Sequence, residues 1–261
     1  MINYDDIITF RASDGNTIRF EHRESLPSVV ALAREYAKAG YPDRYVIFTE
    51  KQTAISATGN LLSDSEIESG LYMSCILRPS IFPSQAGPIS AFSATALATA
   101  LEEHSDNEIG IGWVSDIYCN GTKIGCTSVE GKLDNFTSYE YLIVTFAVKL
   151  DNKKFPPRLT DMVRQVFEEK SISVPQIMAK TVLNKFFGMY KELKTPEKHL
   201  SAYTNRSVLT DVSIKYIEDG KKKPGKVVGI DKSTLALLVE TKDGRRLNIT
   251  SPSHIILPSK L

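Results

Sequence analysis

The stretch that decides the fold runs from residue 51 to residue 79. It begins Lys51-Gln52-Thr53-Ala54, continues Ile55-Ser56-Ala57-Thr58-Gly59-Asn60, and closes with Ser69-Gly70-Leu71-Tyr72-Met73-Ser74 and then Leu77-Arg78-Pro79. The segment of residues 55–60 contains no lysine or arginine. It can therefore offer hydrogen bonds from hydroxyl groups, but no fixed positive charge.

Length and composition predict one sizeable core with a small accessory domain. Of the 261 residues 42% are hydrophobic, and 32 basic residues balance 31 acidic ones. This balance gives no overall reason to expect nucleic acid or an anionic membrane as a partner. The start, from Met1 to Asp6, lacks the basic and apolar regions of a secretory signal, and no apolar run is long enough to span a bilayer. The sequence therefore predicts a cytoplasmic protein.

The cysteines and histidines show neither a disulfide framework nor a metal site. The cysteine count is odd, with no Cys-x-x-Cys pair, and the histidines lack metal-ligand spacing. We expect reduced thiols that pack as small core residues, and no bound metal. The residues concerned are Cys75, Cys119, Cys126, His22, His104, His199 and His254.

Hydrophobic periodicity predicts an α+β layout with one mixed or antiparallel sheet. The turn dipeptides Asp14-Gly15 and Asn120-Gly121 each predict a hairpin, because both favour positive φ. Strands are expected at residues 7–10, 17–20, 45–48, 108–113, 116–119, 123–130 and 141–150. Helices are expected from near Pro27 to Gly40 and at residues 90–103, 158–170 and 174–193.

The composition changes after Leu193. Residues 194–198 indicate a solvated linker, and short strands separated by tight turns are expected at 212–216, 226–230, 234–240 and 246–250. Such spacing is typical of a small barrel of about 60 residues. The basic runs at 221–223 and 245–246 are interpreted as solvated turn tips. The alternative is a basic patch that binds an acidic carrier protein or nucleic acid.

In order and spacing these segments resemble the biotin protein ligases. The pattern of that family runs Gln-Thr-x-Gly-Arg-Gly-Arg-x-Gly, then Leu-Tyr-x-Ser and Leu-Arg-Pro, and this chain keeps the distance from Gln52 to Tyr72. The stretch 225–231 resembles the Gly-x-x-x-Gly-Ile-Asp element of the family's SH3-like domain. The resemblance implies a catalytic domain over residues 1–195 and an SH3-like β-barrel over 196–261. Since only about 20 residues precede Glu24, no DNA-binding winged helix is expected.

The resemblance also implies a reaction that uses ATP, magnesium and biotin. The biotin carboxylate attacks the α-phosphate of ATP, and the acyl group then passes to a lysine of a carrier protein. Fixed cations and close backbone amides stabilise the charge that develops in both steps. In this chain Ser56 and Thr58 stand where the family has arginines, and Ile55 and Ala57 where it has glycines. A hydroxyl cannot replace a bidentate guanidinium, so low affinity for an adenylate is expected.

A second motif lies at residues 112–116, Gly-Trp-Val-Ser-Asp, which resembles the family's Lys-Trp-Pro-Asn-Asp. Lys123, which resembles a family lysine, is expected to contact a ligand carboxylate or adenylate oxygen, or else to be an ordinary strand lysine. Asp116 is expected either to bind a magnesium-bridged phosphate or to cap the strand turn. Cys126 replaces a glycine that should border the biotin ring, and thus adds bulk there.

Two further elements of the family are altered. A strand that carries two glycines and an asparagine in the family corresponds to residues 143–148, which read as an ordinary β-strand. Ser25, in a segment that resembles Asp-Ser-Thr-Asn, either touches a ureido-like group or caps the following helix, and capping is favoured. The predicted site has Lys123 and Asp116 as catalytic residues and, as ligand-binding residues, Ser25, Gln52, Thr53, Trp113, Gly125 and Cys126.

Two hypotheses about function follow. The favoured one is a degenerate homologue that binds a small carboxylate ligand or a protein partner without adenylating anything. The other is an active ligase that attaches biotin, or a related carboxylate such as lipoate or a fatty acid, to a biotin carrier protein. Neither hypothesis involves DNA or a membrane, and a homodimer is left open.

Overall fold

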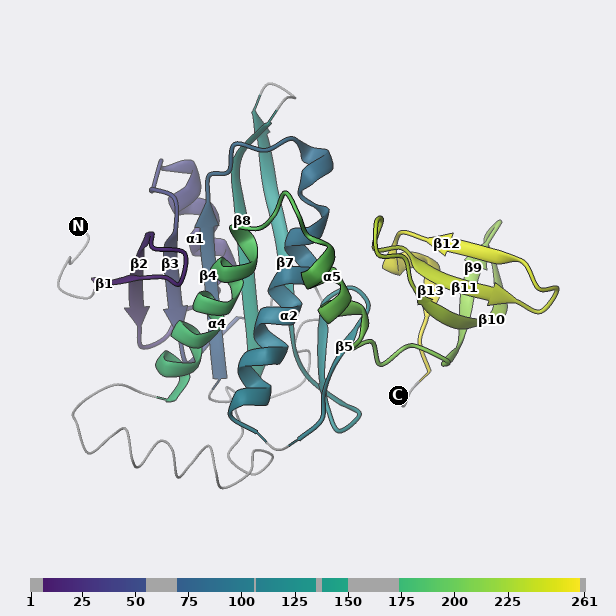
Figure 1. Cartoon of the computed structure of the whole chain (residues 1–261). Coiled ribbons are helices and arrows are strands. Elements are labelled where there is room, and N and C mark those ends of the chain that lie inside the picture. Colours follow the sequence, from purple (N-terminus) through teal and green to yellow (C-terminus); the bar gives the residue numbers. More distant parts are fainter. Residues whose placement is uncertain (1–6, 55–69, 106, 135–137, 150–173, 259–261) are drawn as a thin grey trace.

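The structure is a computed structural model, and it describes residues 7–54, 70–105, 107–134, 138–149 and 174–258. Two sheets organise the chain, one of eight strands and one of five (Figure 1). The segment 55–60 and the helix predicted at 158–170 lie outside the described residues.

The eight-stranded sheet has the order β1-β2-β3-β4-β8-β7-β6-β5. Its neighbouring strands are antiparallel except for β2 and β3, so the predicted mixed sheet is confirmed. Asn120 and Gly121 have φ of 48° and 76°, the positive values that a tight hairpin turn requires. The strands are β1 (Ile7–Arg11), β2 (Thr17–Arg23), β3 (Tyr45–Thr49), β4 (Gly70–Leu77), β5 (Ile109–Gly112), β6 (Asp116–Cys119), β7 (Thr122–Asp134) and β8 (Ser138–Lys149).

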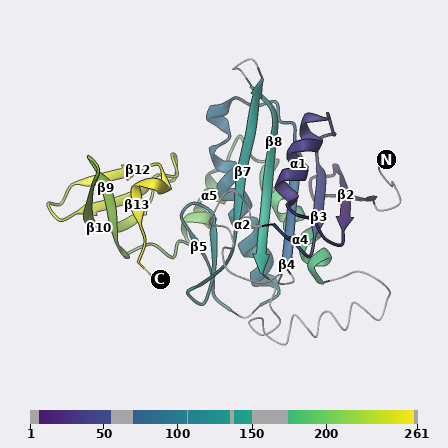
Figure 2. The ribbon, with the colours of Figure 1, turned by 180° about the vertical axis from the view of Figure 1, so that it is seen from behind.

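Helices cover the two faces of this sheet unequally. On one face lie α2 (Gly87–Glu103), α4 (Val174–Tyr190) and α5 (Glu197–Thr204), and on the other lies α1 (Val29–Lys38) (Figures 1 and 2). Because strand side chains alternate, Met73 packs in the core below α2 and α4, while Tyr72 faces α1. No helix in the described part of the chain is long and apolar enough to cross a membrane.

Residues of the 51–79 stretch hold both ends of α1. At its start the Gln52 side-chain oxygen accepts a hydrogen bond from the Val29 amide, at 3.1 Å. At its end the Arg78 guanidinium donates to the carbonyls of Ala37 at 2.7 Å, Tyr41 at 2.7 Å and Glu140 at 3.1 Å. Positive charge suits the carbonyl end of a helix, and acceptors suit the amide end.

The N-cap of α1 is Ser28, whose hydroxyl accepts from the Ala31 amide at 3.3 Å. The prediction that Ser25 caps this helix is therefore wrong, because the chain from Leu26 to Pro27 first pairs with residues 51–54. The helix consequently begins three residues later than a cap at Ser25 would require.

The second sheet is antiparallel, with the order β12-β11-β10-β9-β13. Its hydrogen-bonded pairs leave β12 and β13 as edges, so the described strands form an open sheet and the predicted barrel is not closed. Helix α5 starts within the predicted linker and buries Leu200 and Tyr203, and the domain boundary at 195 stays a prediction. The strands are β9 (Ser213–Glu218), β10 (Lys221–Ile230), β11 (Leu237–Thr241), β12 (Arg246–Ile249) and β13 (Ile255–Ile256).

Candidate functional site

A row of paired side chains crosses four strands on the α1 face of the eight-stranded sheet. Cys126 of β7 pairs with Ala147 of β8, Ala147 with Tyr72 of β4, and Tyr72 with Thr49 of β3. Directly opposed residues point to the same face, and three strand spacings amount to roughly 14 Å. All four side chains are buried. This floor row, as we call it, separates two groups of predicted site residues.

The first group lies at one end of the floor row, where β6 meets β7. Asp116 opens β6 directly opposite Cys126, and Lys123 lies near the start of β7. The Lys123 ammonium is 2.9 Å from the Asp116 carboxylate, and the two side chains are 32% and 29% exposed. A ligand carboxylate that approaches Lys123 thus meets an ammonium whose charge Asp116 already balances.

The ring of Tyr118 covers Gly112, the position where the family has a lysine. A Cβ atom added at Gly112 would lie 2.7 Å from Tyr118 Cε2, so any side chain there requires the ring to move. Burial raises the pKa of the Tyr118 hydroxyl above its ordinary value, with the negative charge of Asp116 as a lesser cause. The hydroxyl is therefore neutral near pH 7. Tyr118 was not predicted as a site residue from the sequence. The signal that could have found it is Gly112, since a glycine in place of a lysine leaves space for a neighbouring ring.

Gly125 and Cys126 are explained by strand packing. A Cβ atom on Gly125 would lie 2.4 Å from the Ala147 carbonyl oxygen and 3.0 Å from Val148 Cα, so β8 itself requires a glycine. Burial is the main reason that the pKa of the Cys126 thiol rises to about 12. The thiol is therefore protonated at neutral pH and is no nucleophile. Cys75 and Cys119 are also free and buried, as predicted.

The second group lies beyond the other end of the floor row, beside the start of α1. Residues 51–54 run alongside Leu26 and Pro27, with the Leu26 amide 3.0 Å from the Lys51 carbonyl and the Thr53 amide 2.9 Å from the Leu26 carbonyl. Ser25 and Thr53 are exposed. The side-chain oxygen of Gln52 is engaged by the first amide of α1.

We expect Gln52→Ala to destabilise the protein by about 1 kcal/mol, because the first amide of α1 loses its acceptor. Gln52→Glu keeps an acceptor and should retain the stability. Thr53→Ala is the matched neighbour, and it should change the free energy of unfolding by less than about 0.5 kcal/mol. Urea denaturation measures all three. Equal stability of Gln52→Ala and the unmodified protein would rule out the capping role.

Trp113 lies three residues before Asp116, but its side chain is buried in a different cluster from Cys126. Its side chain is buried in the core on the side of α2, and its indole N–H donates to the Leu235 carbonyl at 2.7 Å. Its predicted ligand-binding role stays a prediction.

Two buried hydroxyls that were not predicted from the sequence lie one step along the strands from the floor row. Ser74 and Thr145 are directly paired across β4 and β8, and their hydroxyl oxygens are 2.8 Å apart. They stand two residues from Tyr72 and Ala147, hence on the same face. Alternation within the two strands was the signal that could have placed them there.

The described residues offer little to hold magnesium. In these ranges no group of three His, Cys, Asp or Glu side chains lies close enough to bind a metal ion. Magnesium in nucleotide sites usually takes one or two carboxylates together with phosphate oxygens. Asp116 is the carboxylate that the resemblance suggests, and Lys123 is already its ion-pair partner.

A mixed sheet with one helix beside a candidate ligand face, followed by a small second sheet, is the biotin/lipoate ligase-like catalytic fold. Biotin protein ligase from Aquifex aeolicus, solved in complex with biotin and ATP, has a TM-score of 0.65 and 17% identity, covering 91% of this chain and 97% of that one. A biotin protein ligase-like protein of unknown function from Silicibacter sp. has a TM-score of 0.63 and 14% identity, covering 89% and 94%.

Sequence similarity points to the same family. The bifunctional ligase/repressor BirA of Bacillus subtilis is 25% identical over 232 residues, which cover 85% of this chain and 70% of BirA. BirA of Bacillus spizizenii is 24% identical over the same length. No protein-family model matches the chain. The chain is thus similar in sequence to the BirA ligases and in fold to the biotin protein ligases.

Proposed function

We propose that this chain binds a small carboxylate-bearing ligand on the α1 face, over the floor row, and does not adenylate biotin at the rate of a ligase. The observation that carries the proposal is the Asp116–Lys123 ion pair, at 2.9 Å, together with the Tyr118 ring over Gly112. At the positions of the family's two lysines, this chain thus has Lys123, which is paired with Asp116, and Gly112, which the Tyr118 ring covers.

The charge balance supports binding without adenylation. An acyl-adenylate requires cations around its phosphate, and each charge-assisted hydrogen bond contributes about 1.5–3 kcal/mol. The residues of the 55–60 segment carry no cation, and the Asp116–Lys123 pair has no net charge. Removal of two such hydrogen bonds corresponds to a decrease of about 10²- to 10⁴-fold in adenylate affinity. A carboxylate ligand requires fewer cations than an adenylate, and the Lys123 ammonium, which has three donors, can bond to it while it stays paired with Asp116.

The alternative is an active ligase that transfers biotin or a related carboxylate to a biotin carrier protein in the cytoplasm. This alternative is supported by Asp116 and Lys123, which match residues of the family and lie close together. Each side chain is about a third exposed, so a substrate can reach both from solvent.

Biotin is the probe for the proposed site. In calorimetric titration we expect it to bind at least about a hundredfold more weakly than it binds the Aquifex aeolicus ligase measured in parallel. Lys123→Ala should weaken any measurable carboxylate binding a further tenfold or more, because the ammonium is lost. The unfolding midpoint should barely change, since a partly exposed ion pair contributes at most about 1 kcal/mol.

Lys132→Ala is the control, because Lys132 is also an ion-paired lysine of β7, 2.6 Å from Glu140. It should leave carboxylate binding unchanged. Submicromolar binding of biotin would contradict the expected weak affinity and favour the active-ligase alternative. Unchanged binding by Lys123→Ala would make Lys123 a structural residue.

A further inference from the structure

The segment that precedes Asp116 is held from two sides. On one side the Trp113 indole N–H donates to the Leu235 carbonyl of the five-stranded sheet domain, at 2.7 Å. On the other side the Tyr203 hydroxyl of α5 donates to the Val114 carbonyl, also at 2.7 Å. Asp116 follows two residues after Val114, so both hydrogen bonds act at the entrance to β6.

Asp231 builds the turn that presents the Leu235 carbonyl. One of its oxygens, Oδ1, accepts four hydrogen bonds, from the amides and hydroxyls of Ser233 and Thr234, at 2.6–3.0 Å. The Leu235 amide donates to the Asp231 carbonyl at 2.8 Å, and Leu235 has a φ of 59°. A non-glycine residue in this left-handed region is strained, so the surrounding hydrogen bonds must fix it.

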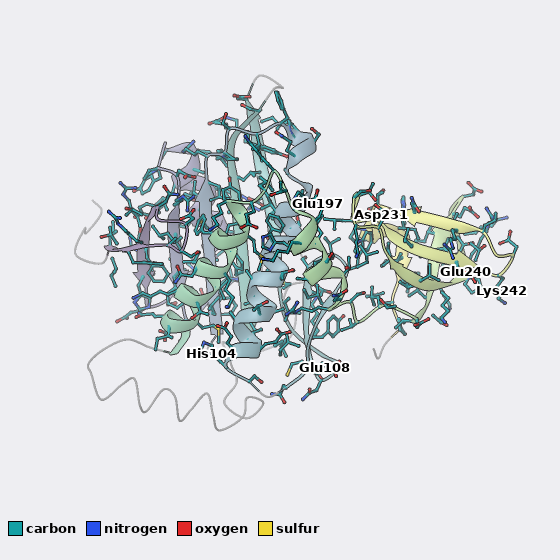
Figure 3. All side chains as sticks on the ribbon, in the orientation of Figure 1. His104, Glu108, Glu197, Asp231, Glu240 and Lys242 are labelled. Carbon is teal, nitrogen blue, oxygen red and sulfur yellow. The ribbon has the colours of Figure 1, made fainter. Side chains whose placement is uncertain are left out.

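The location of this turn suits contact between the two sheets. Figure 3 shows Asp231 at the end of the five-stranded sheet nearest to the eight-stranded one, with Lys242 toward the opposite end. Leu235 is buried with Trp113 in a single core cluster. The two hydrogen-bonded groups are 122 positions apart in the chain, so only the tertiary fold brings them together.

Strand β5, at the edge of the eight-stranded sheet, is held by a separate set of contacts. The Ile111 amide donates to the Arg206 carbonyl at 2.7 Å, and the Val208 amide donates to the Ile111 carbonyl at 3.0 Å. Arg206 in turn binds Glu102 of α2 with two hydrogen bonds, at 2.9 and 2.8 Å. Strand β5 is thus anchored to the helical layer, and the contacts of Trp113 and Val114 hold the connection to β6.

We infer that the five-stranded sheet acts as a positioning domain, in which the Asp231 turn holds Trp113 and thereby fixes Asp116 beside Lys123 and Cys126. Asp231, Leu235 and Trp113 are positioning residues in this arrangement. Because only the geometry of the site is involved, this role does not rest on the proposed function, and it can be tested without a ligand.

Trp113 is the single tryptophan of the chain, so its fluorescence reports on this contact alone. In Asp231→Ala the turn loses its acceptor, and the emission should shift to longer wavelength as water reaches the indole. Asp231→Asn keeps an oxygen at the Oδ1 position and should show the unmodified spectrum. Asp243→Ala is the matched control, because Asp243 also accepts side-chain hydrogen bonds, from Thr241 and Arg245, in a turn of the same sheet.

Labelling of Cys126 by a thiol reagent, followed by peptide mass mapping, tests the effect on the site. Cys126 lies directly opposite Asp116, and its thiol is buried, so it reacts only when the packing around it opens. Asp231→Ala and Trp113→Phe should each accelerate its labelling roughly three- to tenfold, the effect of removing one hydrogen bond. Asp231→Asn and Asp243→Ala should leave the rate unchanged.

Cys75 provides an internal control, since it faces the opposite side of the sheet. Its labelling rate should not change in any variant. Equal acceleration of Cys75 and Cys126 would indicate general unfolding and overturn the inference. Emission and Cys126 labelling in Asp231→Ala that match those of Asp243→Ala would overturn it as well.

Discussion

A biotin carrier domain should remain unlabelled when the purified protein is supplied with ATP, magnesium and biotin. The 55–60 segment carries no cation, and the Tyr118 ring covers Gly112, where the family has a lysine. Because two charge-assisted hydrogen bonds to the adenylate cannot form, labelling should be at least about 10²- to 10⁴-fold slower than with the Aquifex aeolicus ligase under the same conditions. Transfer of radiolabelled biotin to the carrier measures the rate.

A variant that restores the family's residues in this segment provides the positive control for this prediction. It combines Ile55→Gly, Ser56→Arg, Ala57→Gly and Thr58→Arg, which return the glycines and arginines. This variant should bind a biotinyl-adenylate analogue at least about tenfold more tightly than the unmodified chain. Transfer by the unmodified chain at the rate of the Aquifex aeolicus ligase would contradict the prediction and favour the active-ligase alternative.

Arg78→Ala should lower the free energy of unfolding by about 2–4 kcal/mol, because three carbonyl groups lose a charged donor at once. The guanidinium joins Ala37 at the end of α1, Tyr41 in the following loop and Glu140 in β8. Half-burial of Arg78 prevents water from fully replacing these bonds. Urea denaturation measures the decrease. The slope of the unfolding free energy against urea concentration should stay unchanged.

Two variants sharpen this stability test. Arg78→Lys should recover only part of the stability, because an ammonium lacks the planar fork that reaches three carbonyls. Arg34→Ala is the matched control: it breaks a two-bond contact with Glu130, but both side chains are more than 30% exposed, and a decrease of at most about 1 kcal/mol is expected. A decrease in Arg34→Ala as large as in Arg78→Ala would refute the proposed role of Arg78.

Sequence patterns predicted the elements whose signals are local. The Asn120-Gly121 dipeptide placed a hairpin, and residues 116–119 form β6 with the predicted bounds. A hairpin also limits the distance between its two strands, which is why Asp116 and Lys123, on either side of the Asn120-Gly121 turn, can form an ion pair.

Features that depend on tertiary contacts were not predictable in this way. Helix α5 has only eight residues, and it begins in a charged stretch that resembles a linker. Burial of Leu200 and Tyr203 against α2, rather than helix propensity, stabilises it. Closure of the second sheet likewise depends on how its edges meet, which strand spacing leaves undetermined.

The same distinction applies to the candidate site. Gln52 was expected to face a ligand, and its identity gives no sign that its side chain caps a helix 23 positions away in the chain. Trp113 was likewise expected to bind a ligand, and its residue type gives no sign that its indole bonds to Leu235, in the turn between β10 and β11. Residue type and spacing identify chemically capable groups, and the tertiary fold determines what those groups contact.

The Tyr118 ring over Gly112 also restricts the evolutionary routes open to this chain. Lysine at position 112 cannot be accepted while the ring stays in place, since the first side-chain atom would lie 2.7 Å from it. The ring belongs to a buried residue, so its displacement disturbs the packing around β6. A lysine at position 112 therefore requires either that the Tyr118 ring moves or that Tyr118 is replaced by a smaller residue. Positions 112 and 118 are therefore coupled, and a change at one of them alters which residues the other accepts.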